Sequence, residues 1–253
     1  MRILLIFVSF IFWITVNGQY PFEKYSAIQY REFKNWKFPF DIKENTAHCI
    51  LTIPDFYSSR DSLTIQIIPI EMFETFPTNT EHKSYIKIYR NQTLVQRIFE
   101  PMWFNDLNIN TESVGVADIN GDKLDDIKMV VSYMGNGIAS MNVRKIYLFQ
   151  NSDSSFTKIS FDDKGGGLTE RDVDGDGDFE IITRTLQAYM EHNYWLFNLF
   201  EYNNKKLISA NSKANYPIMI QFLYRENYAI TDKISRDEMK EFAMPLPQGY
   251  DER

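Results

Sequence analysis

The sequence has few of the residues that usually carry nitrogen- or sulfur-based chemistry. Its 253 residues include three histidines and one cysteine. A zinc site needs several such ligands, and a serine or cysteine triad needs a histidine close to its nucleophile. His48, His82 and His192 are far apart in the sequence, and none stands beside a nucleophile motif. The lone Cys49 excludes an intramolecular disulfide and favours a buried thiol.

Positive charge is scarce as well. Lysine and arginine number 27 against 34 aspartates and glutamates, which gives a formal net charge of −7. A nucleic-acid partner requires a basic footprint, so this class of partner is disfavoured. The hydrophobic fraction of 44% is ordinary for a globular protein. A chain of this length buries a core without disulfide staples, which excludes a disordered tail or a miniprotein.

Only one long apolar run is present, and it lies at the N-terminus. Residues 3–16 read ILLIFVSFIFWITV behind Arg2. This pattern predicts a secretory signal peptide over residues 1–18, cleaved between Gly18 and Gln19. An uncleaved anchor is the alternative, but the run is shorter than the roughly 20 residues of a bilayer span. We therefore expect a secreted or periplasmic protein with no transmembrane span after signal removal.

The rest of the chain has the character of β-structure. Aromatic residues make up 15% of it, and Ser62–Ile70 alternates apolar and polar residues, as strands do. Helical periodicity is absent through the middle of the chain. Residues 19–45 show little periodicity and are interpreted as an N-terminal lead-in segment that lies on a domain spanning 46–245. The sequence therefore predicts an all-β fold.

Near the C-terminus, Ser235 and Glu238 form a capping box ahead of apolar residues. We expect a short helix there, within residues 236–243. The last residues, 246–253, are predicted to be a flexible tail.

An internal repeat is the most informative feature. One unit, over about 112–160, begins SVGVADINGDKLDDIKMVVSY, and the second, over about 167–210, begins GLTERDVDGDGDFEIITRT. Asp118 aligns with Asp172, and Phe149 with Phe200, so an acidic loop and a later hairpin recur together. A fainter copy of the hairpin alone begins at Tyr85. A period near 50 residues with several short strands per unit is typical of propeller blades.

Each acidic loop places oxygen-bearing side chains at alternate positions and closes on a carboxylate, the pattern by which a chain winds around calcium. Clustered carboxylates repel one another without a cation. The alternative is an ordinary acidic turn, which is common for a single loop, but two loops in matched places favour metal. The first predicted site comprises Asp118, Asn120, Asp122, the Leu124 carbonyl and Asp126. The second comprises Asp172, Asp174, Asp176, the Asp178 carbonyl and Glu180.

Calcium in these loops is expected to be structural, and the two sites are not equal. An EF-hand is excluded because its twelfth position, a bidentate glutamate, is Met129 or Thr183 here, and strand-like sequence follows both loops. The sixth position of such a loop favours glycine, since the backbone turns through positive φ. Gly177 supplies it in the second loop and Lys123 stands there in the first. The second site is therefore predicted to be the better one.

These residues resemble the FG-GAP or VCBS repeat family. VADINGDKLDDIKMVV and ERDVDGDGDFEIITR match its loop-and-strand pattern, and IYLFQNSDSSFTKI and LFEYNNKKLI resemble its later hairpin. The resemblance covers about residues 110–210 and implies a calcium-loop β-propeller, as in the integrin α-subunit head. A chain of this length holds only a small propeller of about four or five blades, or the repeat is reused in another closed β-fold.

The resemblance implies a non-enzymatic protein that binds a protein or glycan ligand, as in adhesion. Two alternatives stay open. Small exported proteins with this repeat include periplasmic inhibitors of lysozyme-like peptidoglycan hydrolases, which an acidic chain would suit. The other alternative is a polysaccharide-active enzyme or its accessory subunit, since carboxylate pairs perform glycoside hydrolysis. No catalytic residue is predicted.

Overall fold

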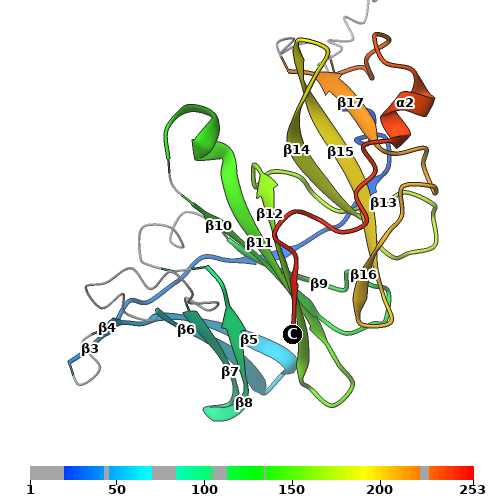
Figure 1. Ribbon diagram of the computed structural model, residues 1–253. Helices are drawn as coiled ribbons and strands as arrows, with labels where there is room; N and C mark the ends of the chain where they lie inside the picture. The colour runs from blue at the N-terminus through cyan, green and yellow to red at the C-terminus, as the bar shows by residue number, and fades with distance from the viewer. Residues whose placement is uncertain are drawn as a thin grey trace, which may run out of the picture.

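The computed structural model describes residues 20–42, 46–69, 84–102, 104, 113–133, 135–222 and 228–253. Strands in antiparallel sheets dominate this part of the chain, and none of its sheets closes into a barrel (Figure 1). The all-β prediction is confirmed. The predicted signal peptide over 1–18 lies outside the described residues.

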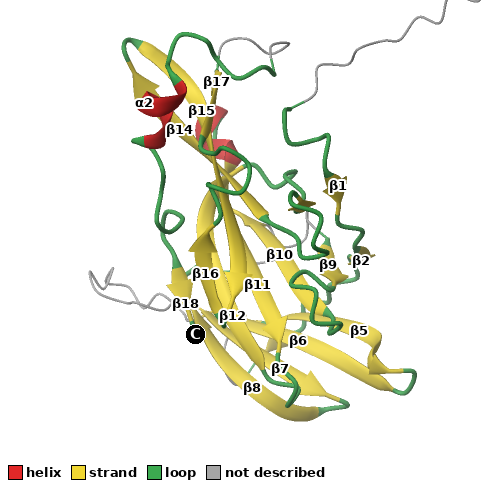
Figure 2. Ribbon diagram, turned by 90° about the vertical axis from the view of Figure 1, so that its right-hand side faces the viewer, coloured by secondary structure: helices red, strands yellow, loops and turns green. Residues whose placement is uncertain are grey.

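A six-stranded sheet forms the middle of the molecule, with strand order β18-β12-β11-β10-β9-β2. Figure 2 shows its long strands running between the two other large sheets. Both faces of this sheet are covered, so its central strands are buried on each side. The strand bounds are β2 Arg31–Phe33, β9 Val114–Ala117, β10 Asp126–Ser132, β11 Asn142–Gln150, β12 Phe156–Lys164 and β18 Asp251–Glu252.

One face of the central sheet packs on a four-stranded sheet of order β5-β6-β7-β8. Leu63, Ile65 and Ile67 alternate with more exposed residues along β6 and enter the shared core, as the sequence pattern predicts. The core thiol Cys49 is buried at the start of β5. The strand bounds are β5 Cys49–Ser58, β6 Asp61–Pro69, β7 Ser84–Arg90 and β8 Thr93–Glu100.

The opposite face packs on a second four-stranded sheet, in which β15 pairs with β14, β16 and β17. Tyr147 and Phe149 of β11 enter this second core, whereas Ile146 and Leu148 enter the first. The period of two along a strand thus sends neighbouring side chains to different cores. The strand bounds are β14 Ile181–Tyr189, β15 His192–Asn203, β16 Lys206–Ser209 and β17 Ile218–Gln221.

The N-terminal segment runs along the larger sheets and contributes β2 to the central one, whereas β1 and β3 belong to two separate two-stranded sheets. β1 (Ser26–Ala27) pairs with β13 (Arg171–Asp172), and β2 pairs with β9. β3 (Phe40–Asp41) pairs with β4 (Thr46–Ala47). The lead-in segment of the sequence analysis therefore lies beside the strands that precede both acidic loops.

Helix is confined to short pieces in the described residues. A 3₁₀ turn, η1, spans Gly137–Met141, and the helix α2 spans Arg236–Lys240 with the predicted Ser235 capping box in place. No helix there has the length and apolar character that crossing a bilayer requires. Within the predicted C-terminal tail, Asp251–Glu252 form β18 and pair with β12.

Candidate metal centre

The two acidic loops lie side by side, at the start of the units that the sequence analysis aligned. The Phe179 N–H donates to the Ile119 carbonyl at 2.9 Å and so joins one loop to the other. The backbone of Gly121 lies so close to Asp178 that a Cβ there would collide with the carboxylate. Each loop leads into a three-stranded meander, β10-β11-β12 or β14-β15-β16.

The closing carboxylate of each loop performs the same task. Asp126 accepts the Ile119 N–H at 3.0 Å, and Glu180 accepts the Val173 N–H at 2.8 Å. Ile119 and Val173 are the second residues of their loops, and both closing residues are buried. The matched bonds brace the two loops in the same way, which the sequence alignment alone does not reveal.

The inner positions of the loops match as well. Asp122 accepts the Leu124 N–H at 2.8 Å, and Asp176 accepts the Asp178 N–H at 3.0 Å. The sixth residues, Lys123 and Gly177, have φ of 70° and 96°. A side chain in this left-handed region costs roughly 1 kcal/mol, so the first loop holds Lys123 at an energetic penalty.

The second loop brings three predicted ligands within reach of one ion. Carboxylate oxygens of Asp172, Asp174 and Asp176 all lie within 4.8 Å of one another. Asp174 and Asp176 are exposed and Asp172 is half-buried. An arrangement of this kind can hold a metal ion through hard oxygen ligands.

A lysine from a distant turn already contacts this second loop. Lys213 Nζ lies 2.5 Å from Glu201, 2.8 Å from Asp174, 3.0 Å from Glu180 and 3.9 Å from Asp176. Burial lowers the pKa of Lys213, but the surrounding carboxylates have the larger effect and raise this pKa above the ordinary value. The ammonium group therefore neutralises part of the charge that a metal ion would otherwise balance.

In the first loop, none of Asp118, Asn120 and Asp122 forms an ion pair with another described residue. Oδ2 of Asp118 accepts the Lys123 N–H at 2.8 Å, whereas its buried Oδ1 has no hydrogen-bond partner among the described residues. Burial, reinforced by the nearby charge of Asp122, raises the pKa of Asp118. Burial also raises the pKa of Asp126 to about 7, although the Ile119 and Gln150 N–H groups oppose this shift.

The structure thus separates the predicted ligands by role. Asp126 is fully buried, and its two oxygens accept the backbone N–H groups of Ile119 and Gln150, so it braces the loop from within. Asn120 donates to Asp122 at 3.1 Å across the first loop. Within the described ranges, the only trio of acidic side chains close enough for a shared ion is the one in the second loop.

A cavity of about 500 Å³ opens beside the paired loops. Asp122 and Asp178 line it from the two loops. The β11-β12 and β15-β16 turns contribute amide side chains to the lining. Tyr202 contributes an aromatic face there and stacks on Phe149 with ring centroids 3.6 Å apart. The remaining lining residues are Asn120, Leu124, Gln150, Asn151, Ser152, Asn203, Asn204 and Lys205.

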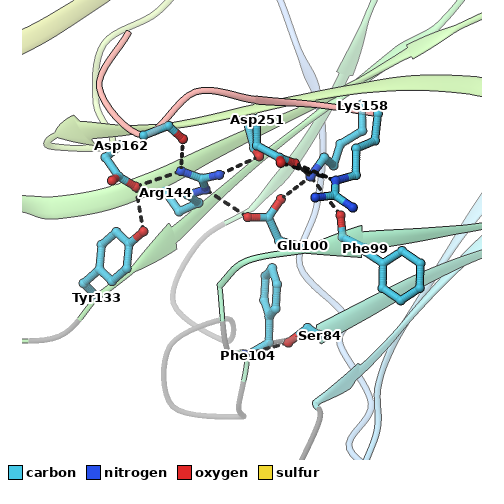
Figure 3. Close-up of polar contacts among 12 residues, drawn as sticks. Ser84, Phe99, Glu100, Phe104, Tyr133, Arg144, Lys158, Asp162 and Asp251 are labelled. Atoms are coloured by element: carbon cyan, nitrogen blue, oxygen red, sulfur yellow. Dashed lines mark hydrogen bonds and ion pairs between the residues drawn. The ribbon is translucent and has the colours of Figure 1, made fainter. Parts of the chain in front are cut away.

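Sequence reasoning missed two buried charge clusters on the central sheet. In one of them, Arg144 of β11 lies between Glu100, at 2.9 Å, and Asp162, at 3.0 Å (Figure 3). Lys158 pairs with the same Glu100 at 2.9 Å and also with Asp251. The signal was available, because basic residues stand inside otherwise apolar strand sequences.

The second cluster lies on the opposite face. Glu170 pairs with Lys128 at 2.7 Å and accepts hydrogen bonds from Tyr30 and Tyr147 at 2.7 and 2.5 Å. Burial alone would raise the pKa of Glu170, but Lys128, Lys145 and the tyrosine hydroxyl offset it and hold the pKa at about 2. This cluster joins the segment before the second loop to β10 and β11.

Comparison of the chain with protein-family models, with curated proteins and with solved structures finds no match. A function for this protein is therefore inferred from the loops, the cavities and the charges described above.

Proposed function

We propose that the protein is an exported, non-enzymatic calcium-binding protein that recognises a protein or glycan ligand. In this proposal the paired loops are structural calcium sites of FG-GAP or VCBS type. The meanders that follow them, β10-β11-β12 and β14-β15-β16, act as blade-like units of a small propeller-related fold. Calcium would fix the loops and, through them, the adjoining cavity.

The observation that carries the proposal is the matched bracing of two adjacent acidic loops. Both closing carboxylates accept the N–H of the second loop residue, at 3.0 and 2.8 Å. Isolated acidic turns have no reason to share these bonds or to lie against each other. Carboxylates crowded in this way repel one another unless a cation lies among them.

The lining of the cavity beside the loops is suited to a hydroxyl-rich ligand such as a glycan. Amide side chains both donate and accept hydrogen bonds, which suits the alternating groups of a sugar ring. Asn151, Asn203 and Asn204 line the cavity and supply such groups, and Tyr202 supplies an aromatic surface. Because Asp122 and Asp178 line the same cavity, ligand binding would depend on calcium.

Thermal melts of the folded protein with calcium and with chelator test the calcium sites. Binding to the folded state alone stabilises it by roughly 2.7 kcal/mol at a hundredfold excess of calcium over Kd. For a chain of this size we expect a rise in Tm of several degrees. Asp176→Asn removes one charged ligand and should reduce that rise, whereas Asp153→Asn, on a neighbouring exposed turn, is the matched control.

Elemental analysis of the purified protein completes this test. Identical melts with and without calcium, together with no bound metal, would contradict the proposal and leave the loops as acidic turns. Glycan binding is then measured separately, by titrating neutral oligosaccharides into the calcium-loaded and the chelated protein. Binding that is unchanged by chelator would uncouple the cavity from the metal.

A further inference from the structure

A second cavity, of about 350 Å³, differs from the acidic loops because basic side chains are part of its lining. It opens where β12 ends, between the central sheet, β14 and the C-terminal segment. Asp162, Asp163, Lys164 and Arg184 supply its charged lining, and Tyr133 also lines it. Pockets that recognise small molecules have volumes from about 300 Å³ upward and a few well-placed polar groups.

Both acidic side chains of this lining already pair with buried basic residues. Asp163 pairs with the fully buried Lys145 at 2.6 Å and accepts the N–H groups of Lys164 and Arg184. Asp162 pairs with Arg144 at 3.0 Å and accepts the Tyr133 hydroxyl at 2.6 Å, as Figure 3 shows.

Arg144, the basic partner of Asp162, is itself balanced by a further acidic side chain. Arg144 is shared with Glu100, which pairs with Lys158, which in turn pairs with Asp251, and Arg253 lies 3.3 Å from Asp251. This series of ion pairs alternates acidic and basic side chains, from Asp162 to Arg253. It therefore has no charge left to neutralise the basic residues of the cavity.

Among the described residues, the basic side chains of the lining have neutral hydrogen-bond partners only. Lys164 Nζ donates to the side-chain oxygen of Asn142, and Arg184 Nε donates to the Lys164 carbonyl at 2.6 Å. Two positive charges are thus left at one cavity of a protein whose net charge is −7. A bound anion would complete the charge balance.

Arg184 is held in position before any ligand arrives. Its guanidinium carbon lies 4.9 Å from the centre of the Trp195 ring, and its main-chain N–H is fixed by Asp163 at 2.6 Å. Gly165, at φ 84°, leaves room for the guanidinium, because a Cβ there would collide with Nη2. With Nε occupied, the two terminal nitrogens keep the fork that binds a carboxylate in bidentate fashion.

From this arrangement we infer that the cavity at the end of β12 binds a small hydroxylated carboxylate of the uronic-acid class through Arg184 and Lys164. The carboxylate lies against the two basic side chains. The hydroxyl groups of the ligand meet neutral lining groups, namely the Tyr133 oxygen and the side chains of Asn142, Thr185 and Gln248. This site is independent of the acidic loops and of calcium.

Calorimetric titration of the full-length folded protein with glucuronate, glucose and acetate tests the inference. We expect glucuronate to bind, glucose to bind at least about tenfold more weakly because it lacks the charged group, and acetate to bind more weakly than glucuronate because it lacks hydroxyls. Raising the salt concentration should weaken glucuronate binding to the unaltered protein. Equal affinity for glucose and glucuronate, or binding of neither, would overturn the site. Acetate binding as tightly as glucuronate would overturn the uronic-acid class.

Variants locate the site. Arg184→Gln and Lys164→Gln should each reduce glucuronate affinity about tenfold or more, since each removes a charge-assisted contact. Arg60→Gln, in an exposed turn of the β5-β6 hairpin, is the matched control and should leave affinity unchanged. Melting curves confirm that each variant folds. If Arg184→Gln does not fold, Lys164→Gln and the salt series decide the question. Unchanged affinity in a folded Lys164→Gln, with no salt dependence, would refute the inference.

Discussion

At the scale of single residues, Lys213 has the largest consequence for the candidate metal centre. It lies in the turn between β16 and β17, and its ammonium group contacts four carboxylates in and beside the second loop. A calcium ion bound to Asp174, Asp176 and Glu180 would meet this positive charge. The better loop geometry given by Gly177 and the competing lysine therefore act in opposite directions.

Lys213→Met separates the two effects. Without calcium, the carboxylates lose their internal counter-ion, so the variant should melt at a lower temperature than the unaltered protein. With saturating calcium, the ion no longer displaces an ammonium group, so the calcium-dependent rise in Tm should be larger. Parallel melts in chelator and in calcium measure both changes. A calcium-dependent rise that is smaller in the variant would show that Lys213 assists metal binding rather than opposing it.

At the scale of elements, the short helix α2 shows how local signals are sufficient when packing agrees with them. Ser235 accepts the Glu238 N–H at 3.2 Å and closes the capping box. Met239, one helical turn from the cap, is buried with Tyr194, Leu196, Met219 and Ile234. The cap therefore fixes the orientation in which the helix covers β15 and β17.

Ser235→Ala should destabilise the protein by about 1 kcal/mol, the usual effect of removing a serine cap. In a chain of this length that corresponds to a decrease in Tm of about 2–4 °C. Ser212→Ala, in an exposed turn, is the matched control and should leave Tm within experimental error. An equal loss in both variants would show that the hydroxyl of Ser235 has no capping role.

At the scale of the whole molecule, buried ion pairs join the layers. The cluster around Arg144 connects β8 of one sheet to β11 and β12 of the central sheet and to the C-terminal strand. The cluster around Glu170 connects the opposite face to the segment that leads into the second acidic loop. Because removing one member leaves its partner buried and unpaired, each cluster makes the layers depend on one another.

Glu170 gives the fold an acid-dependent stability. Its pKa of about 2 in the folded protein lies below the ordinary value of 4.5. A depressed pKa contributes stability that is present above the unfolded pKa and is lost as pH falls toward the folded pKa. The groups that face this carboxyl are Lys128, Lys145, Tyr30 and Tyr147.

Glu170→Gln should therefore be less stable than the unaltered protein at pH 7, by on the order of a few kcal/mol. The difference should shrink as pH decreases from about 4.5 to about 2, because the unaltered protein loses the contribution that the variant lacks. Denaturant unfolding across this range measures the difference. Glu191→Gln, in an exposed hairpin turn, is the control, and a pH-independent difference for Glu170→Gln would contradict the account.

The sequence by itself determined the features that arise from short-range periodicity. Alternation predicted the β6 strand, the loop spacing predicted positive φ at Lys123 and Gly177, and the Ser235 capping box predicted α2. These features depend on residues within one turn or strand, where backbone sterics and local hydrogen bonds decide the conformation. The signal peptide, the repeat family and the calcium ligands stay predictions.

The tertiary structure alone decided which distant groups meet. Lys213 enters the second acidic loop, Glu100 lies between Arg144 and Lys158, and Arg184 reaches the cavity at the end of β12. No local sequence pattern predicts these contacts, because they arise from the face-to-face packing of three sheets. Charged residues inside apolar strands require buried partners, because an unpaired charge is too costly to bury. Only the packing of the layers determined which partners these are.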